Sequence, residues 1–208
     1  MARRNQTAEK RRDLLPVIAR AFTRLGYRRT TTAELAKRCG VQENILYRLW
    51  PDKKAMFVAA IEYVYDFSEK TWLSLLAGVR GQGSTARRLL EFESEHHGEF
   101  GHYRILFTGL SETDDADIRA ALQRVYTRFH HFLLAQVLAH RGAGASDRKR
   151  GASLINSNRL PPAEWAAWAF IGLGTVASIG REVGLLSARQ QRRLIGEIGR
   201  ALLEGGTA

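Results

Sequence analysis

Cysteine, proline and long apolar runs are scarce in this chain of 208 residues. Its single cysteine, Cys39, excludes a framework of internal disulfides and fits a reducing compartment. The longest mostly apolar run, residues 165–180, falls short of the roughly 20 residues that cross a bilayer, so we expect a buried helix there. The charged start, with no apolar stretch after it, does not resemble a secretory signal. We therefore expect a cytoplasmic protein with no membrane partner.

Segments that alternate apolar and polar residues are also missing, which leaves no candidate strand. Apolar residues instead recur at helical spacing along most of the chain. With 45% hydrophobic and 25% charged residues, the sequence can bury a core. The predicted fold is all-α with about nine helices: an amino-terminal three-helix bundle that contains a helix-turn-helix, and a carboxy-terminal helical domain.

Positive charge is concentrated in the first quarter of the chain. Residues 1–54 contain 14 Lys and Arg against 5 Asp and Glu, a net charge of +9. Residues 55–208 contain 18 against 16, a net charge of +2. A generally basic surface would spread the excess along the chain, whereas a concentrated excess favours a polyanion, because each neutralised phosphate releases counterions.

Glycine, proline and capping residues divide this basic region into short helices. Apolar residues from Leu14 to Leu25 recur at helical spacing, and Gly26 then ends the helix in the left-handed conformation. Thr31 opens a capping box in front of a second helix, which Gly40 ends. Pro51 ends a third helix and disfavours helical geometry just before itself.

The rest of the chain is predicted to be helical with two loops. A long helix is expected to begin near Asp52 and to run through Phe67. Loops are expected over 81–84 and, as a mobile segment, over 141–158. Further helices are expected over 85–99, 102–111, 115–140, 160–184 and 187–204.

Residues 31–50 have the pattern of a helix-turn-helix, two short helices joined by a glycine-containing turn. The second helix of such a motif enters a groove about 12 Å wide with polar side chains near its amino terminus. Gln42, Glu43 and Asn44 occupy that end, and Tyr47 follows one turn later beside Arg48. The two amides suit phosphate or base edges, while the carboxylate suits a cytosine amino group or only the helix dipole. Short helix pairs also occur in proteins that never bind DNA. The bare pattern is therefore compatible with a DNA-binding motif and with a helix pair that only packs in the fold.

Six short motifs in this region are more specific: Gly26-Tyr27, Thr30-Thr31, Leu35-Ala36, Gly40-Val41, Leu46-Tyr47 and Trp50-Pro51-Asp52-Lys53. Together they resemble the TetR/AcrR family of bacterial transcriptional regulators. The resemblance runs without a gap over residues 8–68, and beyond it only helical character and length are shared. It implies a DNA-binding domain over 8–68, with the helix-turn-helix at about 31–50, and an effector-binding and dimerisation domain over 69–208.

The resemblance also implies roles for single residues. Thr31 would cap the second helix and touch phosphate, Tyr47 would lie against phosphate or a thymine methyl, and Lys53 would pair with phosphate. Gln42, Asn44 and Trp50 depart from the usual Ser, Gly and Phe, so the operator cannot be inferred from relatives. The expected DNA-binding residues are Thr31, Thr32, Ala33, Gln42, Glu43, Asn44, Tyr47, Arg48 and Lys53.

The function implied is that of a ligand-responsive regulator, a repressor that binds a near-palindromic operator in double-stranded DNA as a homodimer. A small-molecule effector, apolar or aromatic, would release it. Alternatives are a constitutive, sequence-tolerant DNA binder and a helical small-molecule enzyme. Small residues at Ala177, Gly180 and Gly184 permit close helix approach, either between two copies or within one chain.

Aromatic residues in the carboxy-terminal domain supply both core and pocket candidates, since ligand cavities are apolar with few polar groups. The pocket candidates are Tyr63, Phe67, Phe92, His96, Phe107, Tyr126, Phe129, His130 and Trp168. Glu93 and His97 are further polar candidates.

Patterns typical of enzymes are incomplete. Residues 96–99 lack the His-Glu-x-x-His spacing of a zinc site, and the adjacent His130 and His131 diverge on a helix. Gly172-x-Gly174-x-x-Ala177 lacks the preceding strand of a dinucleotide site. We predict no enzyme, no cofactor and no metal.

Overall fold

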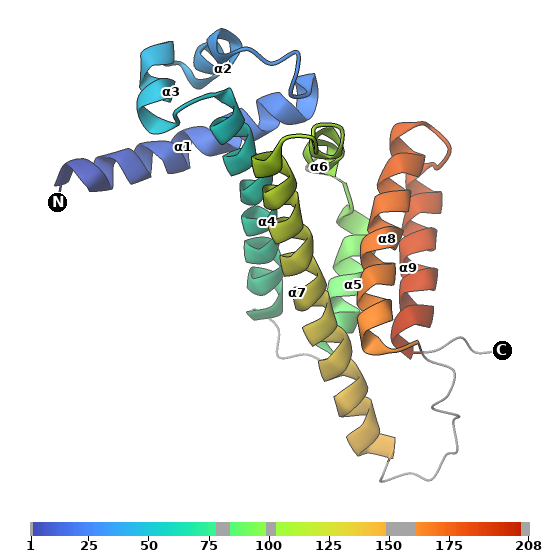
Figure 1. Cartoon of the computed structure of the whole chain (residues 1–208). Helices are drawn as coiled ribbons and strands as arrows, with labels where there is room; N and C mark the ends of the chain where they lie inside the picture. The colour runs from blue at the N-terminus through green and yellow to red at the C-terminus, as the bar shows by residue number, and fades with distance from the viewer. Residues whose placement is uncertain (1, 78–83, 99–102, 149–160, 205–208) are drawn as a thin grey trace. The chain divides into compact units, whose positions relative to one another are not determined.

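The computed structural model describes residues 2–77, 84–98, 103–148 and 161–204. Regular structure within these ranges is entirely helical and forms nine helices (Figure 1). Their bounds are α1 Ala2–Leu25, α2 Thr32–Cys39, α3 Glu43–Leu49, α4 Lys53–Ala77, α5 Thr85–His96, α6 Tyr103–Leu110, α7 Ala116–Arg148, α8 Ala163–Glu182 and α9 Ala188–Glu204. The predicted all-α fold is confirmed.

Local signals at the ends of the first helices are confirmed. Gly26 has a φ angle of 77°, the left-handed conformation expected of it, and Gly40, which was expected to end the second helix, has a φ angle of 63°. Thr31 caps α2, because its side-chain oxygen accepts a hydrogen bond from the backbone N–H of Glu34 at 3.1 Å. Trp50 follows α3 in an extended conformation, as expected for a residue before proline.

The predicted loop from Arg141 is wrong up to Arg148, because α7 continues to that residue. Gly142 costs the helix about 1 kcal/mol relative to alanine. Contacts with distant residues stabilise the helical turn that contains Gly142. The guanidinium of Arg141 donates to the backbone oxygens of Pro161 at 2.7 Å and Leu202 at 3.1 Å. Residues 149–158 of the predicted loop lie outside the described residues, as do 81–83 of the earlier one. The helix predicted over 85–99 ends at His96.

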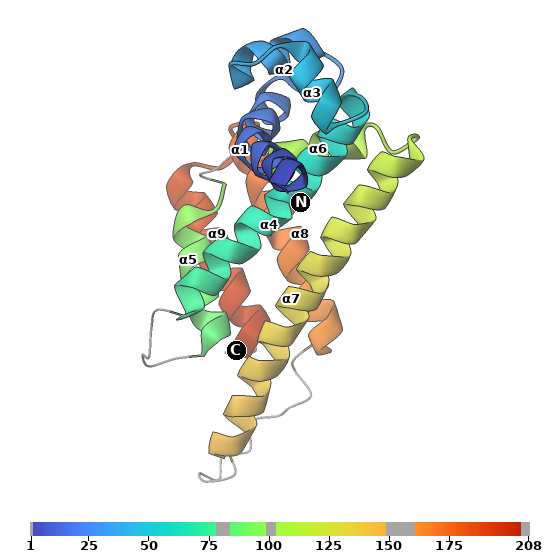
Figure 2. The ribbon, with the colours of Figure 1, turned by 90° about the vertical axis from the view of Figure 1, so that its left-hand side faces the viewer.

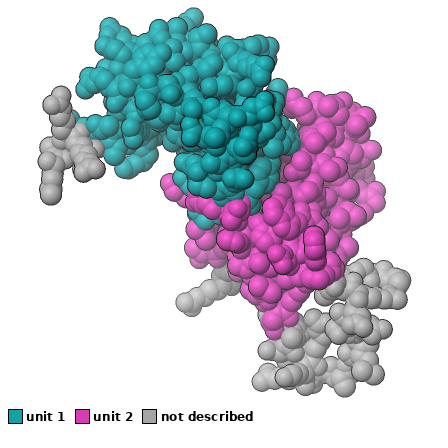
Figure 3. Space-filling view, in the orientation of Figure 1, with its two compact units in different colours: residues 1–69, 101–126 teal, residues 70–100, 127–208 magenta. Residues whose placement is uncertain are grey.

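The chain divides into two compact units, coloured separately in Figure 3. Unit 1 comprises residues 1–69 and 101–126, and unit 2 comprises residues 70–100 and 127–208. The division falls within α4 and within α7, so each of these helices contributes residues to both units.

Unit 1 contains the short helices α2 and α3 around a tightly packed core. In Figures 1 and 2, α2 and α3 lie against one another and α2 lies against α1, in agreement with their residue contacts. Ile18, Leu35 and Leu46 are fully buried, and the buried ring of Phe57 meets that of Phe22 edge-on at 4.9 Å. Helices of seven or eight residues are marginal alone, so this core holds them.

Unit 2 contains α5, α8 and α9, which lie side by side in both ribbon views. Leu90, Ala177 and Ile195 belong to its buried cluster. A Cβ atom at Gly199 would lie 2.3 Å from Cδ1 of Leu90, so α5 and α9 approach closely at that glycine. The sequence did not indicate that the last helix packs on α5.

Helix α8 is only partly buried, which corrects the expectation for residues 165–180. Ala166 and Ala177 face the core, whereas Trp165, Val176 and Ile179 are 67%, 58% and 44% exposed. A single helix buries one stripe against its neighbours, so the apolar residues of the opposite stripe remain at the surface. Among the described helices, none has both the length and the hydropathy that a membrane span requires.

Candidate nucleic-acid interface

Helix α3 presents a polar face away from the core of unit 1. Leu46 and Leu49 point inward and are buried. Gln42, which precedes the helix, and Asn44 and Arg48 within it are exposed. Tyr47 is 48% exposed. The predicted reading residues therefore lie on one accessible side of the helix-turn-helix.

The amino-terminal end of α2 lies beside this face. Thr31 and Ala33 are exposed, although the Thr31 hydroxyl already accepts the capping hydrogen bond. Thr32 is half-buried and joins α2 to α3: its hydroxyl donates to Oε2 of Glu43 at 2.7 Å. The Tyr47 hydroxyl in turn donates to Oγ1 of Thr32 at 3.1 Å. These three residues were predicted separately as DNA contacts, and the hydrogen bonds that connect them have no signal in the sequence.

Lys53 has partners inside the chain. Its Nζ donates to the backbone oxygen of Tyr27 at 3.2 Å and lies 4.4 Å from the centre of the Tyr27 ring. Burial is the largest cause that raises the pKa of Tyr27, followed by the negative charge of Asp115. The Lys53 ammonium is thus held at the start of α4, and its contact with phosphate stays a prediction.

Arg11 braces the far end of α3, a contact that sequence analysis did not anticipate. Its guanidinium donates to the backbone oxygen of Leu49 and lies 5.8 Å from the centre of the Trp50 ring. A cation at the carboxy-terminal end of a helix interacts favourably with the helix dipole. The sequence shows Trp at position 50 in place of the usual Phe. It does not show that Arg11, 39 residues earlier on α1, contacts the Trp50 ring.

Two cations counted in the basic region are paired with acidic residues of unit 1. Arg28 Nε lies 2.9 Å from Glu112 Oε1, and Lys54 Nζ lies 3.2 Å from Asp115 and 2.6 Å from Asp117. Hydrogen bonds to Asp117 and Asp115 raise the pKa of Lys54. These pairs reduce the positive charge that is available to a polyanion, an effect that counting charges along the sequence does not reveal.

The predicted pocket residues fall in both units. Those of unit 1 are Tyr63, Phe67, Phe107 and Tyr126, all half-buried. Those of unit 2 are Phe92, His96, Phe129, His130 and Trp168. Burial raises the pKa of the Tyr126 phenol. The structure therefore supplies aromatic surface in each unit, and the role of these residues as a pocket stays a prediction.

His130 is the most unusual of these candidates. Its ring is only 8% exposed and stacks on Trp168 with centroids 4.7 Å apart. Its Nε2 is buried and has no hydrogen-bond partner among the described residues. Buried polar atoms are normally hydrogen-bonded, so this nitrogen is a candidate contact for a ligand.

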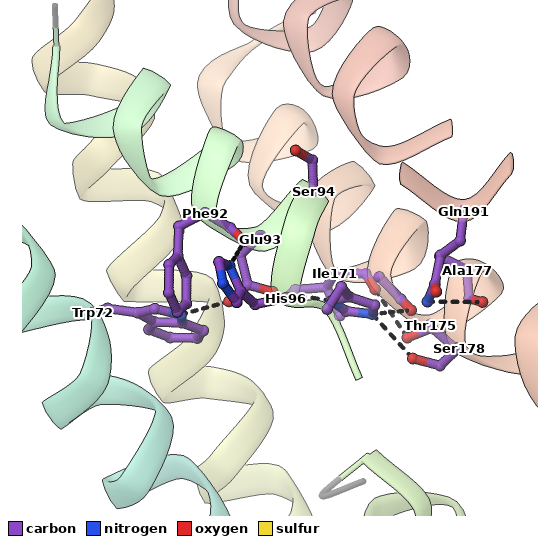
Figure 4. Close-up of polar contacts among 12 residues, drawn as sticks. Trp72, Phe92, Glu93, Ser94, His96, Ile171, Thr175, Ala177, Ser178 and Gln191 are labelled. Carbon is purple, nitrogen blue, oxygen red and sulfur yellow. Dashed lines mark hydrogen bonds and ion pairs between the residues drawn. The ribbon is translucent and has the colours of Figure 1, made fainter. Parts of the chain in front are cut away.

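A buried polar network joins α4, α5 and α8 within unit 2 (Figure 4). Trp72 Nε1 donates to Oε1 of Glu93 at 2.6 Å, and the two side chains point toward each other in Figure 4. The second oxygen of Glu93 lies 3.0 Å from Nδ1 of His97. Nε2 of His97 lies 2.9 Å from the backbone oxygen of Gly174 and 3.0 Å from the Ser178 hydroxyl.

This network shows why His96 and His97 differ. His96 stacks on Phe92 at 4.5 Å, and its Nδ1 lies 3.0 Å from the Phe92 backbone oxygen, one turn back on its own helix. His97 instead connects α5 to α8, although His96 was the residue assigned to the pocket. The sequence could not show which of the two histidines contacts another helix, because the partners of His97 on α8 lie about 80 residues away in the chain.

The amino-terminal region is similar in sequence to known bacterial regulatory proteins. Residues 14–60 match the family model for bacterial regulatory proteins of the tetR family. The nucleoid occlusion factor SlmA of Haemophilus influenzae is 40% identical over 83 residues, which cover 39% of this chain and 36% of that relative. The matched region thus spans about a third of the curated relative's length.

Solved structures extend the likeness to nearly the whole fold. A protein from Rhodococcus sp., described as a TetR-family transcriptional regulator, has a TM-score of 0.73 at 18% identity and covers 94% of this chain and 100% of its own. AibR, solved with isovaleryl coenzyme A and operator DNA, has a TM-score of 0.61 at 15% identity and covers 93% and 98%. The match at the helix-turn-helix and the shared fold agree with the resemblance in the sequence motifs. Residues 14–60 thus carry the amino-terminal region of tetR-family bacterial regulatory proteins, and the fold of the chain is similar to that of TetR-family regulators.

Proposed function

We propose that this protein is a DNA-binding transcriptional regulator that represses its target genes and is released from DNA by a small-molecule effector. The observation that carries the proposal is the polar, exposed face of α3, held by a buried core and bordered by the amino terminus of α2. Gln42 and Asn44 offer amides to base edges in the major groove, and Arg48 offers a cation to phosphate. AibR, which shares the fold, was solved on operator DNA.

The protein acts as a homodimer through the exposed apolar stripe of α8. Val176 and Ile179 on α8 and Val183 just after it follow one another at helical spacing and are exposed, and Ile198 on α9 is exposed as well. Exposed apolar residues in a row along one helix are typical of a protein interface. Ala177 and Gly180, by contrast, serve the chain itself, since a Cβ at Gly180 would lie 2.6 Å from Leu186.

A dimer also suits the DNA. Two recognition helices related by a two-fold axis contact half-sites one helical turn apart, which makes the operator a near-palindrome. The domain limits proposed for these roles remain 8–68 for DNA binding and 69–208 for effector binding and dimerisation. Helix α4 contributes residues to both units, which supports it as the element that links them.

The effector binds among the aromatic residues and shifts α4, so that DNA affinity falls. In unit 2, the buried Nε2 of His130 and the stacked ring of Trp168 support a contact with an aromatic molecule that also forms a hydrogen bond. Coupling of 1–3 kcal/mol between two sites changes affinity by about 5–150-fold, and the effect is reciprocal. Effector and DNA must therefore weaken each other by the same factor.

The DNA-binding face is tested with duplexes that the wild-type protein selects from a random pool. Tyr47→Ala combined with Lys53→Ala removes a phenol and an ammonium from the proposed interface. The affinity for selected duplex at physiological salt should fall by at least tenfold, because a hydrogen bond to a charged group such as phosphate contributes about 1.5–3 kcal/mol. Arg192→Ala, which removes an exposed cation from α9, is the matched control and should leave affinity unchanged. Survival of full affinity in the double variant would show that the surface is wrongly assigned.

The dimer face is tested by sedimentation equilibrium. Val176→Glu places a charge in the exposed stripe of α8 and should convert dimers to monomers. Leu138→Glu alters a residue on α7 that is equally exposed, at 55%, but lies outside the stripe, so dimers should persist. Equal behaviour of the two variants would contradict the proposed interface.

The sequence-tolerant alternative has one specific observation in its favour, the similarity of this chain to a relative named nucleoid occlusion factor. A protein of that kind need not regulate a gene beside its binding site. Mapping of bound sites across the genome separates the two functions: a regulator occupies few sites near promoters, whereas a nucleoid-type binder occupies many sites with no promoter bias.

A further inference from the structure

The hydroxyl protons at the DNA-binding face are directed inward, toward Glu43. An ionised carboxylate only accepts hydrogen bonds, so the proton between Thr32 and Glu43 must come from Thr32. The Thr32 oxygen then accepts the proton of Tyr47. In the DNA-free protein, both hydroxyl groups therefore spend their single donor within the chain.

This arrangement opposes contact with phosphate. A phosphate oxygen needs a donor, and neither Tyr47 nor Thr32 has one to offer while the chain of hydrogen bonds is intact. The carboxylate of Glu43 adds a negative charge on the same face. Only Thr32 hydrogen-bonds to Glu43 among the described residues, which leaves the other carboxylate oxygen available.

We infer that Glu43 is a specificity-determining residue that reads a cytosine amino group and thereby frees the hydroxyl groups of Thr32 and Tyr47 for phosphate. This inference rests on the proposed function. When the carboxylate turns to the base edge, the Thr32 and Tyr47 protons lose their internal acceptor and become donors to the DNA backbone. Correct base readout and backbone anchoring are then coupled, and DNA without the matching base is held less tightly.

Cytosine is the base whose edge suits a carboxylate. Its major-groove edge offers the N4 amino donor, whereas guanine and thymine present acceptors. Adenine places the N7 acceptor next to its amino group, which repels a carboxylate. One cytosine at a fixed position in each half-site is therefore expected in the preferred DNA.

Selection from a random duplex pool tests the base assignment. Wild-type protein should enrich duplexes with cytosine at one position of each half-site, and Glu43→Gln, which keeps the size of the side chain, should lose that preference. Retention of the same cytosine by Glu43→Gln would overturn the assignment. Absence of any enriched sequence with the wild type would overturn the proposed function instead, so the two failures are distinguishable.

A double-mutant cycle on a random-sequence 24-base-pair duplex tests the coupling. Tyr47→Phe removes only the hydroxyl and should weaken binding by less than threefold in the wild-type background, where that group is engaged. In the Glu43→Ala background, which leaves the Thr32 hydroxyl without its internal acceptor, the same change should weaken binding by about tenfold, because a hydrogen bond to a charged group is lost. An equal cost in both backgrounds would refute the coupling.

Thr32→Val provides an independent second background. It removes the middle hydroxyl with little change of volume, so it frees Tyr47 without altering Glu43. Tyr47→Phe should again cost about tenfold on the same random duplex. A cost below threefold in this background would refute the inward direction of the protons, whatever the folding behaviour of Glu43→Ala.

Discussion

Helices α3 and α8 are both half-buried, yet their outward faces differ in chemistry. The exposed side of α3 carries amides, a phenol and a cation, whereas the exposed side of α8 carries Trp, Val and Ile. The inward face of each helix is explained by the core of its own unit. We propose that the outward faces serve partners, a hydrated polyanion for α3 and an apolar surface for α8.

The two regions also differ in how closely their residue identities are shared with relatives. The helix-turn-helix is marked by short motifs that match a family model, while unit 2 is shared with relatives as fold alone. A surface that must fit one DNA groove restricts residue identity, whereas a helical core accepts many apolar combinations of similar volume. Variants that separate the two regions are therefore the most informative.

Truncation of a core side chain should give the largest difference between the two units. Phe57→Ala in unit 1 removes a fully buried ring and should lower the free energy of unfolding by about 3–5 kcal/mol. DNA binding should be lost while dimers persist. Ile195→Ala in the buried cluster of unit 2 should weaken the dimer and, through it, the affinity for a duplex with two half-sites, while the affinity for a single half-site persists. Sedimentation and DNA affinity measured on both variants check this, and loss of dimers in the Phe57→Ala variant would show that the units do not behave separately.

A smaller effect distinguishes two glycines of α9. Gly199→Ala brings a Cβ against Leu90 and should lower stability by about 1–3 kcal/mol through overpacking. Gly196→Ala meets nothing closer than 3.9 Å, and alanine should raise stability by up to about 1 kcal/mol through helix propensity. Urea unfolding of the pair measures the difference. Similar midpoints would contradict the close approach of α5 and α9.

The smallest effect compares a helix cap in each region. Thr31→Ala and Ser84→Ala each remove a side-chain acceptor at a helix amino terminus and should cost about 0.5–2 kcal/mol of stability. Only Thr31→Ala should also weaken DNA binding, since Thr31 alone lies at the proposed interface. Thr31→Ser keeps the cap oxygen and serves as the control for folding. Equal DNA affinity in the two alanine variants would remove Thr31 from the interface.

Sequence predicted best what depends on neighbours within one turn. The cap at Thr31, the left-handed Gly26 and the end of the second helix at Gly40 all follow from local signals. The pairings of Arg11 with Leu49, Lys54 with Asp115 and Thr32 with Glu43 were not foreseen. Each pairing joins segments that are brought together only when the chain folds. The spacing of residues along the sequence therefore does not predict these pairings.

The same limit explains the errors in unit 2. Composition suggested a loop from Arg141, but hydrogen bonds from its guanidinium to two distant backbone oxygens support the helix there. Hydropathy suggested a buried helix over 165–180, because an apolar run does not show which side of a helix meets a core and which meets a partner.

The central claim is that the outward face of α3 distinguishes base order. The most direct test is the ratio of dissociation constants for a selected duplex and for a scrambled duplex of equal length and composition, both at 150 mM salt. Specific DNA-binding proteins show ratios of about a thousandfold or more, and we expect a ratio in that range. Equal dissociation constants for the two duplexes would contradict the account.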